Sequence, residues 1–406
     1  MGKDLSTVVL DNGGYNIKAG NTSMLNPRLV PNAVIKSKAE RKRVFVGTQI
    51  KLLKDHSSLF YMLPLNKGYL VNWDIQRKVW DHVFSKEVLN IKCNDTTLVL
   101  TEPYFNFASI QDTLDEIMFE DYSFAALMRV SPAMLSAYRH YLSAATIDQT
   151  TPANPCVLVV DSGYSFTHIV PFFRGRQIKH LTLRINIGGK AMTNHLKELV
   201  SYRQLHVMDE TYVLNQCKED SCYVSDQFWA DMKLSKLKHP EENTIVREYV
   251  LPDFSQISRG YLRKVERGVE RPQDEQVIKL ANERFTIPEL LFHPSDIGVP
   301  EMGIPEAIAH IIGQCPAVIQ PHLYSSIVLT GGNCLFDGFA TRIEAEVRAL
   351  CPKEYDVRVT VPECPVTYSW HGGVELSKSP LFSEMIVSRK EYAEFGSRIC
   401  RQRFST

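Results

Sequence analysis

Two segments of the chain share one pattern of apolar and polar positions. Each has a run rich in β-branched residues, then Asp, a small polar residue and Gly, and then a second apolar run; they span residues 8–18 and 157–168. This pattern is typical of a buried strand that turns tightly into an antiparallel partner. We expect Gly13 and Gly163 to adopt positive φ in these turns and to leave backbone N–H groups unshielded. The repeat predicts two related halves around a cleft, where two turns can clamp one polyphosphate.

The remaining pattern alternates strands with helices. Buried strands are predicted at residues 98–101 and 327–330, each ended by a turn or a Pro. Helical periodicity predicts a helix within residues 68–90, with Asn72 as its cap. Further helices are predicted at about 109–120, 132–144, 192–202 and 339–350. This alternation favours an α/β protein with helices packed on sheets.

Length and charge limit the possible architectures and partners. A chain of 406 residues is too long for one ordinary core, so two or more lobes are expected. Lys and Arg together number 46, as do Asp and Glu, so any contact with nucleic acid must come from local patches. The N-terminal segment is polar and runs into a strand, which predicts no signal peptide, and no apolar stretch has the length of a membrane span.

The nine cysteines are scattered and contain no CxxC pair. An odd, unpatterned set is typical of reduced, buried thiols in a cytosolic or nuclear protein. Metal binding by Cys217 and Cys222 is the alternative, but no second ligand pair supports it.

Two basic segments interrupt the folded pattern. Residues 36–43 form a short basic run between two apolar stretches, which suits a nuclear import signal, a DNA contact or a solvated loop. Residues 254–275 have few aliphatic anchors and carry Arg263, Arg267 and Arg271, so we expect a mobile surface insertion. Its Arg content suits a partner protein or nucleosomal DNA, although a solvated loop is equally compatible.

A set of separated motifs, all in one order, indicates a family. These motifs are Asp11-Asn12-Gly13, Lys18-Ala19-Gly20, Val71-Asn72-Trp73-Asp74, Leu100-Thr101-Glu102, Asp161-Ser162-Gly163, Thr167-His168, Gly331-Gly332 and Trp370-His371-Gly372-Gly373. Through them the chain resembles the actin family over essentially its whole length. Residues 102–107, 161–168 and 202–211 are most similar to a nuclear branch of the actin-related proteins that takes part in chromatin remodelling.

The resemblance implies an actin-like fold, a duplicated ribonuclease H-like α/β architecture with two lobes of two subdomains each around a nucleotide cleft. Subdomain 1 would comprise residues 1–31, 62–150 and 367–406. Subdomain 2 would comprise residues 32–61, with a shorter loop than in actin. Subdomain 3 would comprise 151–187 and 290–366, and subdomain 4 would comprise 188–289 with the basic insertion.

The resemblance also implies the residues of a site for ATP or ADP with Mg. The implied nucleotide-binding residues are Asp11, Asn12, Gly13, Gly14, Lys18, Asp161, Ser162, Gly163, Gly189, Lys218, Glu219, Gly331, Gly332 and Asn333. Asp11 and Asp161 would hold the Mg ion through water. The alternatives are that both Asp residues only cap their turns and that Lys218 and Glu219 form a solvated charge pair.

Several positions depart from the actin pattern. Gly14-Tyr15 stands where actin has Ser-Gly, which removes a hydroxyl next to the terminal phosphate, and Tyr164-Ser165 stands where actin has Asp-Gly. Val366 replaces a Lys of the adenine pocket. Pro132 occupies the position of the Gln that orients the attacking water, and a Pro side chain cannot position water.

His168 is retained as a residual catalytic candidate, or it is a satisfied core histidine. With Pro132 at the position of the water-orienting Gln, we expect a bound, structural nucleotide and no efficient hydrolysis. The chain is therefore predicted not to be an enzyme beyond a very weak ATPase.

These expectations combine into a non-filamentous nuclear actin-related protein. It would act as a scaffold subunit of a remodelling complex that exchanges a variant histone into nucleosomes, and so in transcription regulation. Its partners would be the remodeller ATPase and accessory subunits, with possible nucleosome or DNA contact through Lys36–Arg43 or residues 254–275. The alternatives are an actin-like ATPase switch with slow hydrolysis and a heterochromatin-organising protein independent of a remodeller. A sugar or acetate kinase lacks a candidate base, and the short subdomain 2 loop and the insertion argue against self-polymerisation.

Overall fold

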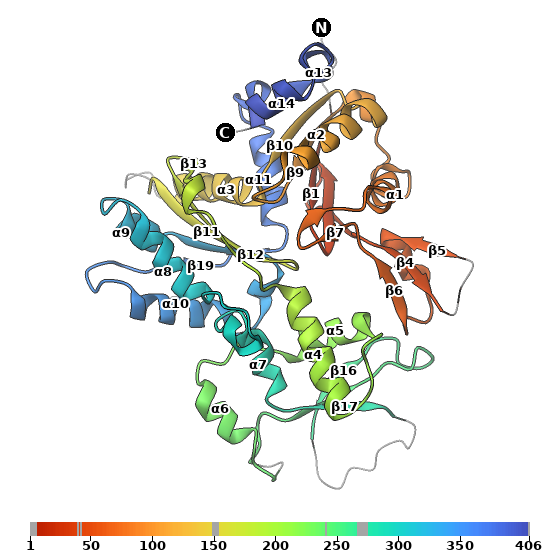
Figure 1. Cartoon of the computed structure of the whole chain (residues 1–406), viewed down its shortest axis with the longest axis vertical. Coiled ribbons are helices and arrows are strands. Elements are labelled where there is room, and N and C mark those ends of the chain that lie inside the picture. The colour runs from red at the N-terminus through yellow and green to blue at the C-terminus, as the bar shows by residue number, and fades with distance from the viewer. Residues whose placement is uncertain are drawn as a thin grey trace.

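A computed structural model of the chain describes residues 6–38, 40, 43–147, 154–239, 242–265 and 275–404. It is a mixed α/β structure in which several sheets are surrounded by helices (Figure 1). The α-helices are α1 Trp73–Phe84, α2 Ala108–Glu116, α3 Pro132–Ile147, α4 Gly189–Arg203, α5 Thr211–Ser221, α6 Phe228–Leu234, α7 Glu283–Glu289, α8 Ile304–Gln314, α9 Gln320–Tyr324, α10 Phe339–Leu350, α11 Tyr368–Leu376, α12 Phe382–Met385, α13 Arg389–Phe395 and α14 Ser397–Phe404.

The two repeated segments form the two predicted hairpins. In the first, β1 (Ser6–Asn12) pairs antiparallel with β2 (Asn16–Asn21), and Asp11 lies opposite Lys18. In the second, β11 (Cys156–Ser162) pairs antiparallel with β12 (Thr167–Phe173), and Asp161 lies opposite His168. Each Asp is therefore the second-last residue of its strand, next to the turn.

Each hairpin begins a sheet of the same design. β1 pairs parallel with β9 (Thr96–Thr101), which pairs parallel with β10 (Ala126–Val130). In the same way β11 pairs parallel with β18 (Ile327–Thr330), which pairs parallel with β19 (Val359–Thr360). The predicted pair of related halves is confirmed by this matching strand order.

Shorter strands complete the two sheets. The first sheet also contains β3 (Arg28–Pro31) and β20 (Val387–Ser388). The second contains β13 (Arg176–Gln177) and β14 (Leu183–Ile185), both paired with β12.

Helices α3 and α11 pack against each other between the two sheets (Figure 1). Leu135 and Trp370 face the first sheet, whereas Ala133 and Tyr368 belong to the apolar cluster of the second. The backbones of the two helices approach closely, because a Cβ added to Gly372 would lie 2.1 Å from the carbonyl oxygen of Leu135. This pair of helices therefore couples the two halves below the hairpin turns.

Most predicted helices are confirmed, with changed ends. Asn72 caps α1 by accepting a hydrogen bond from the backbone N–H of Ile75 (3.2 Å), and α10 has the predicted bounds. The helix predicted at 109–120 ends at Glu116 and continues as a π-helical turn over Ile117–Asp121.

Two small three-stranded sheets lie outside the main pair. One contains β4 (Val34–Ser37), β5 (Val44–Val46) and β6 (Leu59–Met62), and the other contains β15 (Arg247–Val250), β16 (Tyr261–Lys264) and β17 (Val277–Leu280). A two-stranded ribbon joins β7 (Leu65–Asn66) to β8 (Tyr69–Leu70).

The prediction of a mobile basic insertion is wrong for Tyr261–Lys264. Strand β16 lies inside it and pairs with β15. Arg263 contacts Glu248 at 3.0 Å and Glu275 at 2.7 Å, and so joins the edge strand to its neighbours. These internal ion pairs were not visible in the sequence because the acidic partners are distant or lie beyond the Arg run. Arg267 and Arg271 lie outside the described residues, as do Arg41 and Lys42 of the first basic run.

The structure also bears on the expected state of the cysteines, on the alternative of a metal site at Cys217 and Cys222, and on the expectation of no membrane span. All nine cysteines are free thiols, and Cys217 and Cys222 are buried, but the expectation of burial is wrong for Cys364, which is exposed, and for Cys93, which is half-buried. Within the described ranges, no cluster of three or more His, Cys, Asp or Glu residues is arranged to hold a metal ion. In the same part of the chain, no helix combines the length and apolar character needed to cross a bilayer.

Candidate functional site

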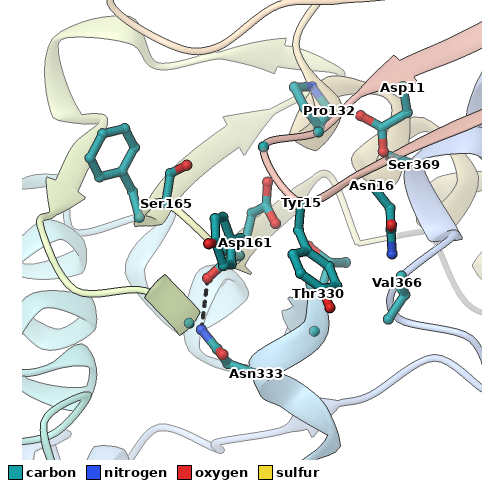
Figure 2. A pocket seen from close by; sticks show the side chains of 18 of the residues that line it. Asp11, Tyr15, Asn16, Pro132, Asp161, Ser165, Thr330, Asn333, Val366 and Ser369 are labelled. Carbon is teal, nitrogen blue, oxygen red and sulfur yellow. Dashed lines mark hydrogen bonds between the residues drawn. The ribbon is translucent and has the colours of Figure 1, made fainter. Parts of the chain in front are cut away.

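A cavity of about 480 Å³ lies between the two hairpin turns. Its walls come from both turns, from the start of α3, from α4 and α5, and from the turn after β18 (Figure 2). The predicted residues that line it are Asp11, Asn12, Gly13, Gly14, Lys18, Asp161, Gly163, Gly189, Lys218, Glu219, Gly331, Gly332 and Asn333. Only Ser162 of the predicted set lies behind the wall, where its hydroxyl accepts a hydrogen bond from Asn333 (3.0 Å). The structure therefore brings together residues that are more than 300 positions apart.

Asp11 is held by three donors of the protein itself. The hydroxyls of Thr101 and Ser369 donate to its two carboxylate oxygens, both at 2.8 Å, and the Nζ of Lys18 lies 3.1 Å from Oδ2. An Asp that only caps its turn would bond to local backbone N–H groups. Instead, Asp11 ties the first hairpin to β9 and α11 and fixes Lys18 beside the cavity.

Asp161 faces the same cavity from the other hairpin with a different environment. Burial raises its pKa to about 6, with Lys18 opposing the shift and Asp11 adding to it. No hydrogen bond to its carboxylate is present among the described residues, so it can accept water or a cation. The two carboxylates therefore differ: Asp11 is bound by side chains of the protein, whereas Asp161 can still bind water or a cation.

The prediction of positive φ at Gly13 and Gly163 is wrong, and of these two only Gly13 is needed for space, since a Cβ on Gly163 would lie 3.6 Å from the carbonyl oxygen of Phe166. A Cβ on Gly13 would lie 2.6 Å from the carbonyl oxygen of Asn16, which the turn brings inward. Positive φ occurs instead in the third turn, at Gly331 (φ 96°). A Cβ there would lie 2.2 Å from the carbonyl oxygen of Ser162.

Lys218 is buried, and the alternative of a solvated charge pair is wrong for it. Its Nζ donates to the carbonyl of Gly189 (3.2 Å) and to the side-chain oxygens of Thr193 and Asn215 (both 3.0 Å). Burial lowers the pKa of Lys218. Glu219 is exposed, lines the cavity and accepts a hydrogen bond from Asn215 at 2.7 Å. This network joins α4 and α5 and presents polar atoms to one end of the cavity.

His168 is not a satisfied core histidine. It is buried, and within the described part of the chain its Nε2 has no hydrogen-bond partner. Burial and the nearby Arg184 lower its pKa to about 3, so the ring is neutral at physiological pH. An unpaired buried nitrogen on the cavity wall is the kind of group that a bound phosphate or water would satisfy.

The departures predicted from the sequence lie at the cavity wall. Pro132 is the first residue of α3, where its missing N–H costs nothing, and its ring faces the cavity with Val366 (Figure 2). The rings of Tyr15 and Tyr164 pack together with their centroids 5.1 Å apart. The side chains of Tyr15, Tyr164 and Pro132, which differ from the actin pattern, therefore all line the cavity between the two hairpins.

Some site residues were missed from sequence. Thr101 and Ser369 hold Asp11, and Asn215 and Thr193 hold Lys218; all four are common polar residues, and only Asn215 lies near its partner along the chain. Ser369 directly precedes the Trp370-His371-Gly372-Gly373 motif, and this was the only signal for it.

The asymmetric pair of Asp residues fits a metal–nucleotide group better than a bare metal ion. A divalent cation prefers oxygen ligands, and phosphate oxygens and water would complete the shell that Asp161 begins. Lys18 would supply a positive charge to the phosphates, and Nε2 of His168 would supply a hydrogen bond.

Comparison with known proteins gives one consistent family. A sequence model of the family described as Actin matches residues 2–405. The chain is 43% identical over 398 residues to a Drosophila melanogaster protein named Actin-related protein 6, covering 98% of this chain and 99% of the relative. It is 40% identical over 419 residues to Actin-like protein ARP6 of Cryptococcus neoformans (98% and 84% covered). It is 38% identical over 422 residues to Actin-related protein 6 of Arabidopsis thaliana (98% and 99% covered).

Proposed function

Since the chain belongs to the actin family, as its motifs predicted, we propose that it is a nuclear, non-filamentous actin-related scaffold protein. It would serve as a subunit of a chromatin-remodelling complex that exchanges a variant histone into nucleosomes. The names of its relatives support an actin-related protein, and the resemblance of residues 102–107, 161–168 and 202–211 to the nuclear branch supports the role in chromatin. The cleft would hold ATP or ADP with Mg as a structural group.

One observation carries the non-catalytic part of the proposal, namely the position of Pro132 on the cavity wall. Phosphoryl transfer to water needs a side chain that positions the attacking water. Pro132 offers neither donor nor acceptor there, and a neutral His168 acting alone provides one weak base. Hydrolysis is therefore expected to be very slow.

Different residues of the cavity would contact different parts of the nucleotide. Asp161 and its water shell would face the Mg ion, Lys18 the phosphates, and Lys218 and Glu219 the nucleoside end. A group that binds the folded chain and not the unfolded chain stabilises the fold by mass action, by about 2.7 kcal/mol at a concentration one hundred times its Kd. The nucleotide would thus stabilise the folded protein by binding to both halves at once.

Single-turnover measurement of phosphate release separates this scaffold from the alternative, an ATPase switch. The purified full-length protein is mixed with Mg–ATP, next to Asp161→Ala and the exposed-site control Asp356→Ala. We expect bound nucleotide without measurable release in the wild-type protein. Release that Asp161→Ala abolishes and Asp356→Ala preserves would establish the ATPase switch instead.

The nuclear partners are tested by mass spectrometry of the intact complex after extraction from nuclei, with the bound nucleotide released and identified. We expect a remodeller ATPase and accessory subunits in stable association. Association with heterochromatin proteins alone would favour the second alternative, and recovery as a free cytoplasmic monomer would contradict the nuclear assignment. Sedimentation over a range of concentrations should show no self-polymerisation.

The ion pairs of the insertion favour the first basic segment as a DNA contact. Arg259 contacts Asp220 at 2.7 Å and Arg263 contacts two glutamates. In the first basic segment Lys38 contacts Asp209 at 3.5 Å, but Lys36 and Arg43 are exposed and form no ion pair with another described residue. We expect Lys36→Glu with Arg43→Glu to weaken DNA binding and to lower the salt slope by about one for each phosphate that is no longer neutralised. Arg259→Glu is the matched control, and a larger effect of this control would assign the DNA-binding surface to the insertion.

A further inference from the structure

The two hairpin turns are joined across the mouth of the cleft by aromatic side chains. Tyr15, from the first turn, packs on Tyr164, from the second, with ring centroids 5.1 Å apart. The hydroxyl of Tyr15 also accepts a hydrogen bond from Asn215 of α5 at 3.2 Å. Tyr15 therefore connects three segments that form separate walls of the cavity.

A second group of contacts joins the small β4–β5–β6 sheet region to the start of α5. His56 stacks on Tyr212 with ring centroids 4.9 Å apart and an interplanar angle of 18°. His56 also packs against Phe254 at 5.7 Å. The backbone N–H and the hydroxyl of Ser58 both donate to the carboxylate of Glu210, the nearest distance being 3.0 Å.

Tyr61 of β6 packs, like Tyr212, against the apolar cluster that contains Ile35, Phe45 and Leu59. Burial raises its pKa, and Tyr15, Tyr212 and Tyr164 are close enough to raise it further. Burial also raises the pKa of Tyr164 to about 12. Tyr15, Tyr61 and Tyr164 are therefore neutral at physiological pH, because burial raises the pKa of each, and no charge repulsion among these three rings opposes their packing. One tyrosine comes from each of the two turns, one from β6 and one from α5.

We infer that Tyr15, Tyr61, Tyr164, Tyr212 and His56 form an aromatic latch that holds the cleft closed whether or not a nucleotide is bound. Each contact of the aromatic latch joins protein to protein, so none of them needs a ligand in the cavity. A ligand in the cavity would be trapped behind the same rings, because Tyr15 and Tyr164 also line it. The aromatic latch therefore predicts slow nucleotide exchange and a closed shape that partner proteins can bind without a nucleotide.

Hydrogen exchange measured by mass spectrometry tests the aromatic latch on the full-length protein. Wild type is compared with Tyr15→Gly/Tyr212→Ala, each with Mg–ADP and after removal of nucleotide with EDTA and charcoal. An aromatic pair is worth about 0.5–1.5 kcal/mol, so removal of two such pairs should speed local opening by about 5- to 150-fold. We expect exchange in residues 59–62 and 211–215 of stripped wild type to stay within about twofold of the ADP-bound form. The stripped variant should exchange the amides of these residues at least about fivefold faster than stripped wild type.

Two controls keep the result specific. Tyr202→Ala removes a tyrosine that is 91% exposed and should behave as wild type. Exchange in β9 and α10 reports global unfolding and should not change in the double variant. Opening of stripped wild type to the same extent as the stripped variant would overturn the aromatic latch. If wild type binds no nucleotide, the proposed structural cofactor fails, but the comparison of wild type with the variant still decides on the aromatic latch.

Discussion

Ser165 fills the space that a side chain on Gly14 would need. A Cβ built on Gly14 would lie 2.7 Å from the Oγ of Ser165, on the turn of the opposite hairpin. The two turns are thus in direct contact, and a hydroxyl absent from the first turn is present on the second. The residue types at these two positions therefore depend on each other.

This contact predicts that Gly14→Ser destabilises the protein and that Ser165→Gly relieves the effect. Overpacking of a tight contact costs about 1–3 kcal/mol, and we expect the lower end because the Ser165 hydroxyl can rotate. Guanidinium unfolding of both single variants and the double variant gives the coupling energy. Gly313→Ser, at a glycine with open space around it, is the control. Strictly additive effects at positions 14 and 165 would contradict the contact.

A larger loss of stability is expected for Gly372→Ala. The added methyl group would lie 2.1 Å from the backbone of Leu135, so α11 and α3 must separate, and both main sheets pack on this helix pair. We expect a loss of at least about 2 kcal/mol in the free energy of unfolding. Gly313→Ala, in the last turn of α8 with no atom within 4 Å of the added methyl group, should be neutral or slightly stabilising. Equal thermal midpoints for the two variants would show that the helices can separate at no cost.

Asp161→Asn should stabilise the ligand-free protein near neutral pH. The folded pKa of about 6 lies above the ordinary value of 3.8, so the folded state binds more protons between these values and loses stability as pH rises. The carboxylate borders a solvent-accessible cavity, which screens part of this cost, and we expect a gain of about 1–2 kcal/mol at pH 7.

Unfolding measured at pH 4 and pH 7 checks this prediction, since the gain should vanish at pH 4. Saturating Mg–ADP should reverse the order at pH 7, because only wild type provides the negative charge that favours the cation. A variant that is less stable than wild type without ligand would show that the Asp161 charge is already compensated by the protein.

The sequence was sufficient for the parts of the structure that depend on local pattern. The strand, Asp and Gly pattern around Asp11 and Asp161 predicted both hairpins and the duplicated design, because alternation and turn residues act over short distances. It did not predict that Asp11 is occupied by Thr101 and Ser369, since such pairs form only when distant segments meet. The turn glycines show the same limit. Gly13 was expected for its φ but is needed because Asn16 turns its carbonyl inward.

The basic insertion shows how composition misleads without pairing information. An Arg-rich stretch with few aliphatic residues is typical of a mobile loop. Arg263 nevertheless lies in a strand because Glu248 of the neighbouring strand and Glu275 neutralise it. Charge counted along the chain cannot distinguish an exposed arginine from one paired across a sheet.

His168 should make the stability of the protein fall as pH decreases, which is opposite to the effect expected for Asp161. Its folded pKa of about 3 lies below the ordinary 6.5, so the unfolded chain binds the proton first and stability falls as pH drops below 6.5. Between pH 7 and pH 5 this group should cost about 2 kcal/mol. The ring is packed between Tyr104 and Phe166, at centroid distances of 5.1 and 5.7 Å, so His168→Leu should keep the packing and remove this pH-dependent cost.

Guanidinium unfolding at pH 5 and pH 7 compares wild type with His168→Leu, each against the exposed-site control His206→Leu. Wild type and His206→Leu should lose stability in parallel toward pH 5, and His168→Leu should lose about 2 kcal/mol less. Asp161 lies directly opposite His168 in the hairpin, and its titration changes stability in the other direction over an overlapping pH range. The free energies of unfolding are therefore compared between variants at the same pH. An imidazole resonance of His168 that titrates near pH 6.5 would show that solvent reaches the ring and that the cavity wall is open at this point.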